Sequence, residues 1–457
     1  MKKNLKNNKG ITLVALIVTI VVLLILAGIT IAAVLADGGI FKTAQNSQKV
    51  QDTAKLEEKV KLMLTDAQIE NKVNNKTLNE YFTEKGLNPK QDATTGTISI
   101  ITEEHKVTIN EENLEIVKIE ESLIIEPNTN WYENPGENGV YTISTAEELA
   151  GLASLVNDGT DTFNGKTIVL GNNIDLQNKD WTPIGNSTNK FQGDFDGQNH
   201  TISNLKVIQE GKGNIGLFGF TAAKNWNSYT PEIKNLTVHN AIVKGRVNVG
   251  AIAGTPYTTE YTNIALTGLV QVDGMAYVGG MFGKNVYEDL TDLTVNVQPG
   301  SYVNANSVEN GIAYRTYAGG VIGFMGENYP EGDYAFAVTN VTSNINVIGT
   351  TIDVGGITGI AHYGNSFINC SSSGNVTITN ALDEDDAAEI GGIAGVWHRG
   401  GDNVIFTNCS YTGTLTATLE DGSSFTDFYN NGLVGRHFSN SGTGRLIIDG
   451  VDVTPET

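Results

Sequence analysis

The pattern of hydrophobic and polar positions changes several times along the chain. Residues 11–35 are almost entirely apolar, and residues 41–84 then place apolar side chains at helical spacing between charged ones. Three later stretches, 97–102, 106–110 and 114–120, alternate apolar with polar residues. These patterns predict an apolar helix, a polar continuation of that helix and a small antiparallel meander. The rest of the chain consists mainly of short stretches rich in Val, Ile and Thr.

The polar continuation of the helix is expected to be amphipathic. Its apolar side chains fall near one face of a helix, which should carry Leu56, Val60, Leu62, Met63 and Leu64. The segment Gly86–Pro89 is expected to end the helix, because glycine and proline interrupt helical patterns.

A short glycine-centred phrase recurs in the second part of the chain. Its copies run from Ile215-Gly-Leu-Phe-Gly to Asn431-Gly-Leu-Val-Gly, and their first glycines are Gly216, Gly250, Gly279, Gly319, Gly355, Gly391 and Gly432. A repeat of this period indicates stacked units that share one core. We therefore expect a mainly β fold over residues 141–457, a parallel β-solenoid (β-helix) of about seven to eight coils. The glycines should sit where the backbone bends or packs closely.

A second column runs beside the glycines and consists of Asn or Asp followed by an apolar or small residue. Its members are Asn204, Asn235, Asn263, Asp292, Asn340, Asn369, Asn408 and Asp449. Asn and Asp accept turn geometry and hydrogen-bond nearby backbone. We expect them to form a ladder at one corner of the stack, with the following residue pointing into the core.

The glycine phrases resemble the GLUG motif of bacterial surface proteins. Two further stretches match the pattern of the same family: residues 191–205, which begin Phe-Gln-Gly-Asp-Phe-Asp-Gly, and residues 164–176. The resemblance covers roughly residues 140–450. It implies a β-helical surface module and no single activity, because one fold can serve many functions.

The N-terminus has the features of a membrane anchor. Four lysines lie among the first ten residues, and the apolar run from Ile11 to Leu35 is long enough to span a bilayer as a helix. Basic residues before an apolar span keep the N-terminus in the cytoplasm, so the rest should be exported. An ordinary secretory signal is the alternative, with its cleavage site near Ala32, Ala33 and Ala36.

The junction Lys9-Gly-Ile-Thr-Leu13 resembles the class III leader of type IV prepilins and pseudopilins. The resemblance implies that a prepilin peptidase cleaves after Gly10 and that Ile11 becomes an N-methylated first residue. It also implies that the apolar helix packs with other pilin subunits when a filament forms. The family usually has Phe and Glu at the first and fifth mature positions, where this chain has Ile11 and Ala15. The missing carboxylate argues against a role in a major pilus.

The sequence therefore divides into four segments. We expect a leader at 1–10, a pilin-like helix and small sheet at 11–120, a Pro- and Gly-containing linker at 121–140 and the solenoid at 141–457. The solenoid should begin with a helix, because Thr145-Ala-Glu-Glu148 forms a capping box ahead of an apolar helical pattern. Such a helix would cover the first coil, whose strand edges would otherwise favour aggregation.

The net charge of the chain argues against one class of partner. The chain has 29 Lys and Arg against 51 Asp and Glu, which gives a net charge of −22 at pH 7. An acidic surface repels nucleic acid, so nucleic-acid binding is set aside.

The expected location is the cell membrane, with a single span and the C-terminal region outside the cell, or a pilus.

The two cysteines, Cys370 and Cys409, occupy corresponding places in neighbouring repeats. Other copies carry Leu, Ile or Val there, so we interpret both cysteines as small buried core residues. A disulfide is the alternative, since stacked coils could bring the Cα atoms within about 7 Å of each other. Two thiols without a histidine at ligand spacing do not indicate a metal site, and no cofactor is expected.

Signs of catalysis are weak. The sequence has no HExxH, G-x-S-x-G or P-loop pattern. Parallel β-helices also host polysaccharide lyases and hydrolases that use clustered carboxylates and arginine. The best local candidates are His398, Arg399, Asp402, Arg436 and His437. We interpret them as polar loop residues and the chain as a non-enzyme, with a membrane-tethered polysaccharide lyase or hydrolase as the alternative.

An acidic run at residues 383–389 contains Asp383, Glu384, Asp385, Asp386 and Glu389. Its oxygens could coordinate calcium. The run lacks an ordered alternation such as D-x-D-x-D-G, so we interpret it as a solvated loop between two coils.

Aromatic residues follow the glycine phrases in several copies. The candidates for ligand binding are Tyr257, His362, Tyr363, Trp397, His398, His437 and Phe438. In a regular stack they would emerge on one edge, where rings could stack on sugars or anchor a protein. The alternative is that these rings only cover loop backbone. The sequence as a whole predicts an anchored, pilin-like surface protein. Its solenoid would serve adhesion to a glycan or to a host or matrix protein. Alternatively, the chain would be a minor subunit of a pilus or pseudopilus.

Overall fold

The computed structural model describes residues 39–454 apart from short gaps. The gaps are 86, 88, 103–104, 122–123, 137–138, 225–228, 286–288, 307, 310–311, 314–315, 327–335, 351–352, 363, 382, 384–386, 388, 399–400, 436 and 439–442. The leader, Gly10, Ile11 and the predicted span at 11–35 lie outside this range. None of the described helices is both long and apolar enough to cross a membrane. The chain divides into two compact units, Met1–Ser122 and Leu123–Thr457.

The described part of the first unit combines two helices with a four-stranded antiparallel meander. The helices are α2 (Gly39–Asn74) and α3 (Leu78–Glu84), and the strands are β1 (Lys90–Asp92), β2 (Thr97–Thr102), β3 (His105–Asn110) and β4 (Ile116–Glu121). Its core joins α2, α3, β2 and β3 through Val60, Leu64, Ala67, Tyr81, Phe82, Ile98, Ile100, Val107 and Ile109.

Two expectations for the helix were wrong. Leu62 is 66% exposed rather than part of the buried face, because helical geometry turns it away from Val60 and Leu64. The helix also does not run to residue 84. Asn75 adopts a φ of 55°, and a second helix starts at a capping box in which Thr77 and Glu80 exchange hydrogen bonds.

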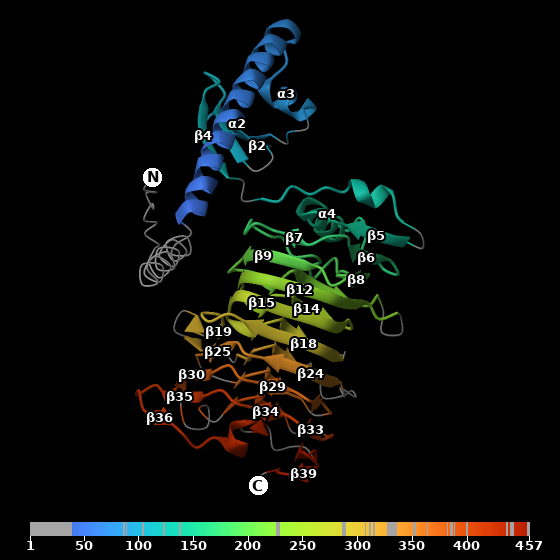
Figure 1. Cartoon of the computed structure of the whole chain (residues 1–457), viewed down its shortest axis with the longest axis vertical. Helices are drawn as coiled ribbons and strands as arrows, with labels where there is room; N and C mark the ends of the chain where they lie inside the picture. Colours follow the sequence, from blue (N-terminus) through green and yellow to red (C-terminus); the bar gives the residue numbers. More distant parts are fainter. Residues whose placement is uncertain are drawn as a thin grey trace, which may run out of the picture. The chain divides into compact units, whose positions relative to one another are not determined.

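The second unit is mainly β and consists of stacked parallel sheets, as predicted. Coils follow one another along the stack from β9 to β33 (Figure 1). We call the three sides of the stack faces A, B and C. Face B contains β10 (Gly213–Ile215), β13 (Val247–Val249), β16 (Ala276–Gly279), β22 (Ala318–Gly319), β26 (Val354–Gly355) and β31 (Ile390–Gly391).

Face C follows each glycine phrase and has seven strands. They are β11 (Phe218–Ala222), β14 (Ala253–Tyr257), β17 (Phe282–Asn285), β23 (Ile322–Met325), β27 (Thr358–Ala361), β32 (Ala394–His398) and β37 (His437–Phe438). The glycine phrase is therefore the turn between faces B and C in the first six copies, whereas the seventh copy, which starts at Asn431, has no face B strand among the described residues.

Face A is the longest side, and successive coils cross it either as one long strand or as two or three shorter ones. The long strands are β12 (Glu232–Lys244) and β15 (Glu260–Gly274), and β9 (Thr201–Ile208) pairs with residues 237–244 of β12. The shorter strands are β5 (Val140–Ile143), β6 (Thr167–Leu170), β7 (Ile174–Asp175), β8 (Asp194–Asp196), β18 (Leu290–Val297), β19 (Tyr302–Ala305), β24 (Ala337–Ser343), β25 (Asn346–Gly349), β28 (Ser366–Ile368), β29 (Ser371–Ser372), β30 (Val376–Ala381), β33 (Val404–Thr407), β34 (Ser410–Tyr411), β35 (Leu415–Leu419) and β38 (Leu446–Ile448). A short hairpin, β20 (Val308–Glu309) with β21 (Ile312–Ala313), and the 3-10 helix η3 (Tyr429–Gly432) lie between these elements.

An asparagine ladder marks the corner within face A. Its members have φ between 48° and 56°, the left-handed region that Asn and Asp tolerate best. Side-chain amides join successive coils, for example Asn263 to Asn235 at 2.9 Å. Asn204 does not belong to this column, contrary to the prediction. It bonds Asp175 and Asn240 at the next bend of the coil, at 2.8 and 3.1 Å.

The glycine turn has no space for side chains. A Cβ on Gly279 would lie 2.0 Å from the carbonyl oxygen of Phe282. A Cβ on Gly320 would lie 2.1 Å from the Gly356 oxygen and 2.8 Å from Ser343 Oγ across the core. Real Cβ atoms do not approach other atoms so closely, so the turn requires glycine at these positions.

The two ends of the stack differ from its middle. At the start, helix α4 (Ala146–Asn157) packs over the first coils, and Thr145 Oγ1 accepts a hydrogen bond from the Glu148 backbone N–H at its N-cap. At the other end, β36 (Ser424–Phe425) and β39 (Val451–Asp452) pair antiparallel with the last parallel strands. The strand direction is therefore reversed where the parallel pairing stops.

Part of the predicted linker at 121–140 packs on the cap. The Asn128 N–H donates to the Glu147 carbonyl oxygen at 2.8 Å, and the 3-10 helix η1 (Asn130–Glu133) follows. Rings of Tyr132, Tyr141 and Phe163 surround the Lys166 ammonium, which also pairs with Asp161, and the Trp131 ring stacks on Phe163.

Candidate functional site

Face C places part of the predicted aromatic row in one column. His398 pairs with Phe438, and His362 lies opposite His398 because Ala361 pairs with Trp397. Tyr257 ends strand β14 and is half-buried, with its ring centroid 6.2 Å from that of Phe220. Tyr363 lies outside the described residues, and only the backbones of His437 and Phe438 are described.

Trp397 lies inside the solenoid rather than on its edge. Its side chain is 1% exposed and belongs to the main core. The sequence-based expectation treated the residues after each glycine phrase as loop, but β32 continues to His398. Neighbouring residues of a strand point to opposite sides, so Trp397 turns inward and His398 turns outward. Trp397 therefore supports the fold and is not a surface contact.

His362 and His398 form a close pair on successive coils. Their ring centroids are 4.8 Å apart, and the Phe324 ring meets His362 edge-on at 5.6 Å. His362 is 5% exposed. Burial, followed by the nearby positive charges of His398 and Lys284, lowers the pKa of His362 to about 3. His362 is therefore neutral at physiological pH and cannot bind an anion by charge.

An aromatic cluster that the sequence reasoning missed lies outside the main core. Tyr277 of face B and Tyr317, which directly precedes β22, stack with centroids 5.6 Å apart, and Phe324 of face C contacts both, at 5.0 and 4.9 Å. Tyr277 is half-buried, while Tyr317 and Phe324 are buried together with Ile360 and Val396. The repeated Tyr just before the glycine phrase, as in Tyr277-Val-Gly-Gly and Tyr317-Ala-Gly-Gly, was the available signal.

The candidate acid–base residues do not form a described cluster. Asp402 is exposed on the loop after β32, and Arg399 and Arg436 lie outside the described residues. Within the described part of the chain, no group of three or more His, Cys, Asp or Glu side chains could hold a metal ion. Of the acidic run, Asp383 is exposed and Glu389 is buried, whereas Glu384, Asp385 and Asp386 are not described. The buried Glu389 departs from the solvated loop predicted for this run, and calcium binding stays the alternative interpretation.

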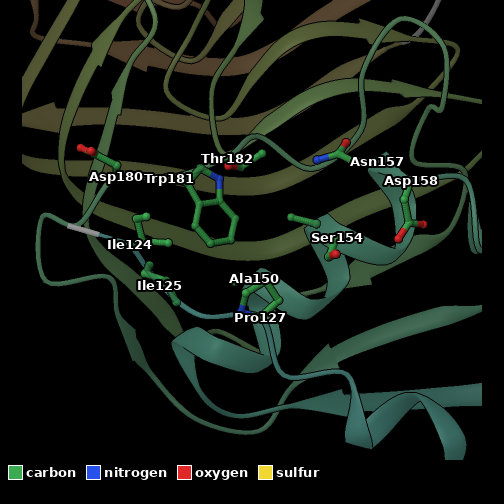
Figure 2. A pocket seen from close by; sticks show the side chains of 11 residues that line it. Ile124, Ile125, Pro127, Ala150, Ser154, Asn157, Asp158, Asp180, Trp181 and Thr182 are labelled. Carbon is green, nitrogen blue, oxygen red and sulfur yellow. The ribbon is translucent and has the colours of Figure 1, made fainter. Parts of the chain in front are cut away.

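The cap of the solenoid contains a cavity of about 400 Å³. Figure 2 shows Trp181 at its centre, between the segment that carries Ile124 and Ile125 and helix α4 with Ala150 and Ser154. The Trp181 indole N–H donates to the Leu217 carbonyl oxygen at 3.0 Å, so only the apolar part of the ring lines the cavity.

Most of the polar groups around this cavity already form hydrogen bonds within the protein. The Asp180 carboxylate accepts from Lys206 Nζ at 2.8 Å, and Asn157 Nδ2 donates to the Pro183 carbonyl oxygen at 2.9 Å. Asp158 lies at the rim, where its carboxylate accepts from the Thr160 N–H. The cavity can hold a small, mainly apolar group but presents no catalytic arrangement.

The two cysteines are stacked in the core, as expected for core residues, and both are free thiols. Cys370 is fully buried and Cys409 is partly buried. Each cysteine directly follows a member of the asparagine ladder, Asn369 or Asn408. The side chains of these two asparagines are hydrogen-bonded to each other at 2.8 Å.

The chain is similar over part of its length to a known protein. No protein-family model matches the chain, and no solved structure matches it. The chain is 31% identical over 202 residues to halomucin of Haloquadratum walsbyi (strain DSM 16790 / HBSQ001). The similarity covers 39% of this chain and 2% of halomucin, so the chain spans a small fraction of that protein's length.

Proposed function

We propose that this chain is a cell-surface protein whose solenoid binds an extracellular ligand without converting it. The observation that carries the proposal is the stack of parallel strands, whose core columns and corners repeat while the outward side chains vary. Such a stack offers a long, rigid surface for recognition. The distant similarity to halomucin and the resemblance to GLUG-containing surface proteins support a place at the cell surface.

Face C is the side on which we place ligand binding. Tyr257 and His398 are partly exposed there, and rings of this kind stack on sugars or fill pockets in protein ligands. His362 lies beside His398 in the same column but is buried, and Trp397 points into the core; both hold the strands in place. The ligand class is a glycan or a host or matrix protein.

The N-terminal segment is the anchor in this proposal. A prepilin peptidase would cleave after Gly10, and the apolar run that starts at Ile11 would hold the protein in the membrane with its C-terminal region outside. The same helix would allow entry into a pilus or pseudopilus as a minor subunit. The resemblance of residues 9–13 to prepilin junctions supports this part of the proposal.

The anchor is tested by the intact mass and the N-terminal residue of the protein from its native cell envelope. A chain that begins at methylated Ile11 supports processing, and Gly10→Ala should then leave the leader attached. A wild-type chain that still carries Met1–Gly10 would reduce the segment to an unprocessed anchor.

Ligand binding is tested with the full-length protein in detergent micelles on arrays of glycans and matrix proteins. We expect Tyr257→Ala to weaken binding at least tenfold. Tyr229→Ala is the matched control, because Tyr229 is a 57% exposed tyrosine that bonds Asp194 of face A. Equal binding by wild type and Tyr257→Ala would contradict the proposed site.

The same preparation separates binding from catalysis. Soluble products released from a bound polysaccharide, and lost in Asp402→Ala, would instead support a membrane-tethered polysaccharide lyase or hydrolase. Binding without product formation supports the adhesion proposal.

A further inference from the structure

The core column behind the asparagine ladder changes its chemistry toward the end of the stack. Its earlier members are the buried aliphatic residues Leu236, Ile264, Leu293 and Val341. The next two coils place Cys370 and Cys409 in the same column. In the following coil, the equivalent position is Gly450, in an exposed turn with φ of 82°. The two thiols are therefore the last side chains of this column.

The strand register sets the two cysteines directly opposite each other. Ile368 pairs with Thr407 on one side, and Ser371 pairs with Ser410 on the other. The Ser410 N–H also donates to the Cys370 carbonyl oxygen at 3.0 Å. Neighbouring strands of a sheet lie about 4.7–4.9 Å apart, and disulfides join Cα atoms about 4.4–6.8 Å apart. The backbone separation therefore suits a disulfide without a change of register.

Neighbouring side chains hold this arrangement from both sides. The Asn408 amide bonds Asn369 at 2.8 Å, and the Phe367 and Phe406 rings stack at 4.7 Å with an angle of 6°. Cys409 Sγ lies 3.4 Å from the Phe367 carbonyl oxygen, an atom of the coil that carries Cys370. The thiol of Cys409 thus leans toward the coil of its neighbour.

We propose that Cys370 and Cys409 are an oxidisable pair that closes into a disulfide between two successive coils. The oxidant is a small-molecule disulfide, such as oxidised glutathione. Cys409 is the partly exposed thiol, so its thiolate attacks the reagent, the reagent's S–S bond breaks, and one small thiolate leaves and takes up the proton that Cys409 lost. The Cys370 thiolate then attacks Cys409 Sγ in the mixed disulfide and expels the second small thiol. In total, two protein thiols are oxidised and one small disulfide is reduced to two thiols.

The electrostatics of the pair agree with this order of steps. The hydrogen bond with Cys370 lowers the pKa of Cys409. The same hydrogen bond, followed by burial, raises the pKa of Cys370. Because the thiolate is the nucleophile in exchange, the first step falls to Cys409, and the second step is the slower one.

The bond would act as a clamp on the final coils. The last units of a solenoid contact a neighbour on one side only and open more readily than central units. A covalent link between the coils of Cys370 and Cys409 restricts the unfolded chain and opposes that opening.

The experiment uses full-length protein purified under reducing conditions, then incubated with oxidised glutathione, denatured and alkylated. We expect the intact mass to fall by two hydrogen atoms, with no alkyl group added and one cross-linked peptide containing both cysteines. The oxidised protein should remain monomeric on a non-reducing gel. Its C-terminal coils should resist protease longer, its thermal midpoint should rise by several degrees, and reducing agent should reverse both effects.

Two single variants, Cys370→Val and Cys409→Val, are the controls, because Val341 already fills this column in the preceding coil. Neither variant should gain protease resistance or thermal stability on oxidation. The wild-type mass decides the case even when a variant folds poorly. Two alkylated thiols after oxidation, a lasting glutathione adduct on Cys409 or a dimer linked through Cys409 would each overturn the proposal. A disulfide that forms but leaves the thermal midpoint unchanged would contradict the proposed stabilisation of the final coils.

Discussion

The side-chain amide of Asn408 donates a 2.8 Å hydrogen bond to the side-chain oxygen of Asn369, which lies 39 residues earlier and one coil away. Asn369 makes the same bond to Asn340, and Asn340 makes it to Asp292, both at 2.9 Å. All these bonds point toward the start of the stack. A carboxylate only accepts, so Asp292 ends this run and cannot donate to the preceding coil.

Replacing Asn340 should destabilise the solenoid for two separable reasons. Asn340→Ala removes two amide bonds and places alanine at a φ of 56°, which together should lower the free energy of unfolding by about 2 kcal/mol. Asn340→Gly loses the same bonds but accepts the φ, so it should cost about 1 kcal/mol less than alanine. Denaturant unfolding of the three proteins measures both differences. An alanine variant as stable as the glycine variant would contradict the role assigned to the backbone.

Gly320→Ala should damage the turn between faces B and C. The new Cβ would lie 2.1 Å from the Gly356 carbonyl oxygen, and relieving this clash requires movement of the backbone of the next coil. We expect a loss of stability of about 3 kcal/mol or more, seen as a lower thermal midpoint and faster proteolysis. Gly211→Ala is the control, because no atom lies within 4 Å of its Cβ position. A Gly320→Ala protein as stable as this control would show that the turn tolerates a side chain.

The buried His362 should make the solenoid sensitive to acid. Its pKa is about 3 in the folded state and near 6.5 in the unfolded chain, so between these values the unfolded chain binds more protons. The stability that His362 contributes is therefore complete above about pH 6.5 and is lost progressively as the pH falls toward 3, with a limiting slope of about 1.4 kcal/mol per pH unit.

Denaturant unfolding of wild type and His362→Phe from pH 7 to pH 4 isolates this contribution. Carboxylates contribute equally to both proteins, so the wild type should lose more stability than the variant over this range. Parallel pH profiles of the two proteins would exclude His362 as the sensitive group.

Lys166→Met should weaken the cap of the solenoid. The ammonium lies 5.4 to 5.7 Å from the ring centroids of Tyr132, Tyr141 and Phe163 and pairs with Asp161. Methionine keeps the apolar stem and removes the charge, so we expect a loss of about 1–2 kcal/mol. The measurement is the thermal midpoint at low and high salt. An exposed substitution of the same type, Lys224→Met, should have little effect.

The sequence was sufficient to predict features that require one residue type at the same position of each coil. Asn235, Asn263 and Asn340 each precede a core residue at a bend, so their spacing revealed the ladder before the structure was known. The same reasoning failed for Asn204, because a second bend of the coil also requires the left-handed conformation and also uses asparagine. One-dimensional spacing does not separate two bends with equal requirements.

The candidate binding side was predictable only in part. The sequence located Tyr257 and His398 after glycine phrases, but it treated those residues as loop and so placed Trp397 on the same edge as His398. Only the extent of β32 shows that the two residues point to opposite sides. The contact of Tyr277 with Phe324 crosses the glycine turn. Whether the two rings meet depends on the angle of that turn, and no sequence pattern indicated this angle.

The reversed strands at the end of the stack have a consequence for behaviour at high density. An open parallel edge is a template on which a second molecule can add its own strands, as in cross-β fibrils. Here β36 and β39 are two residues long and run against the direction of the strands they cover. An incoming parallel coil would find no continuous ladder to extend. Many copies crowded together should therefore remain separate molecules rather than polymerise through this end.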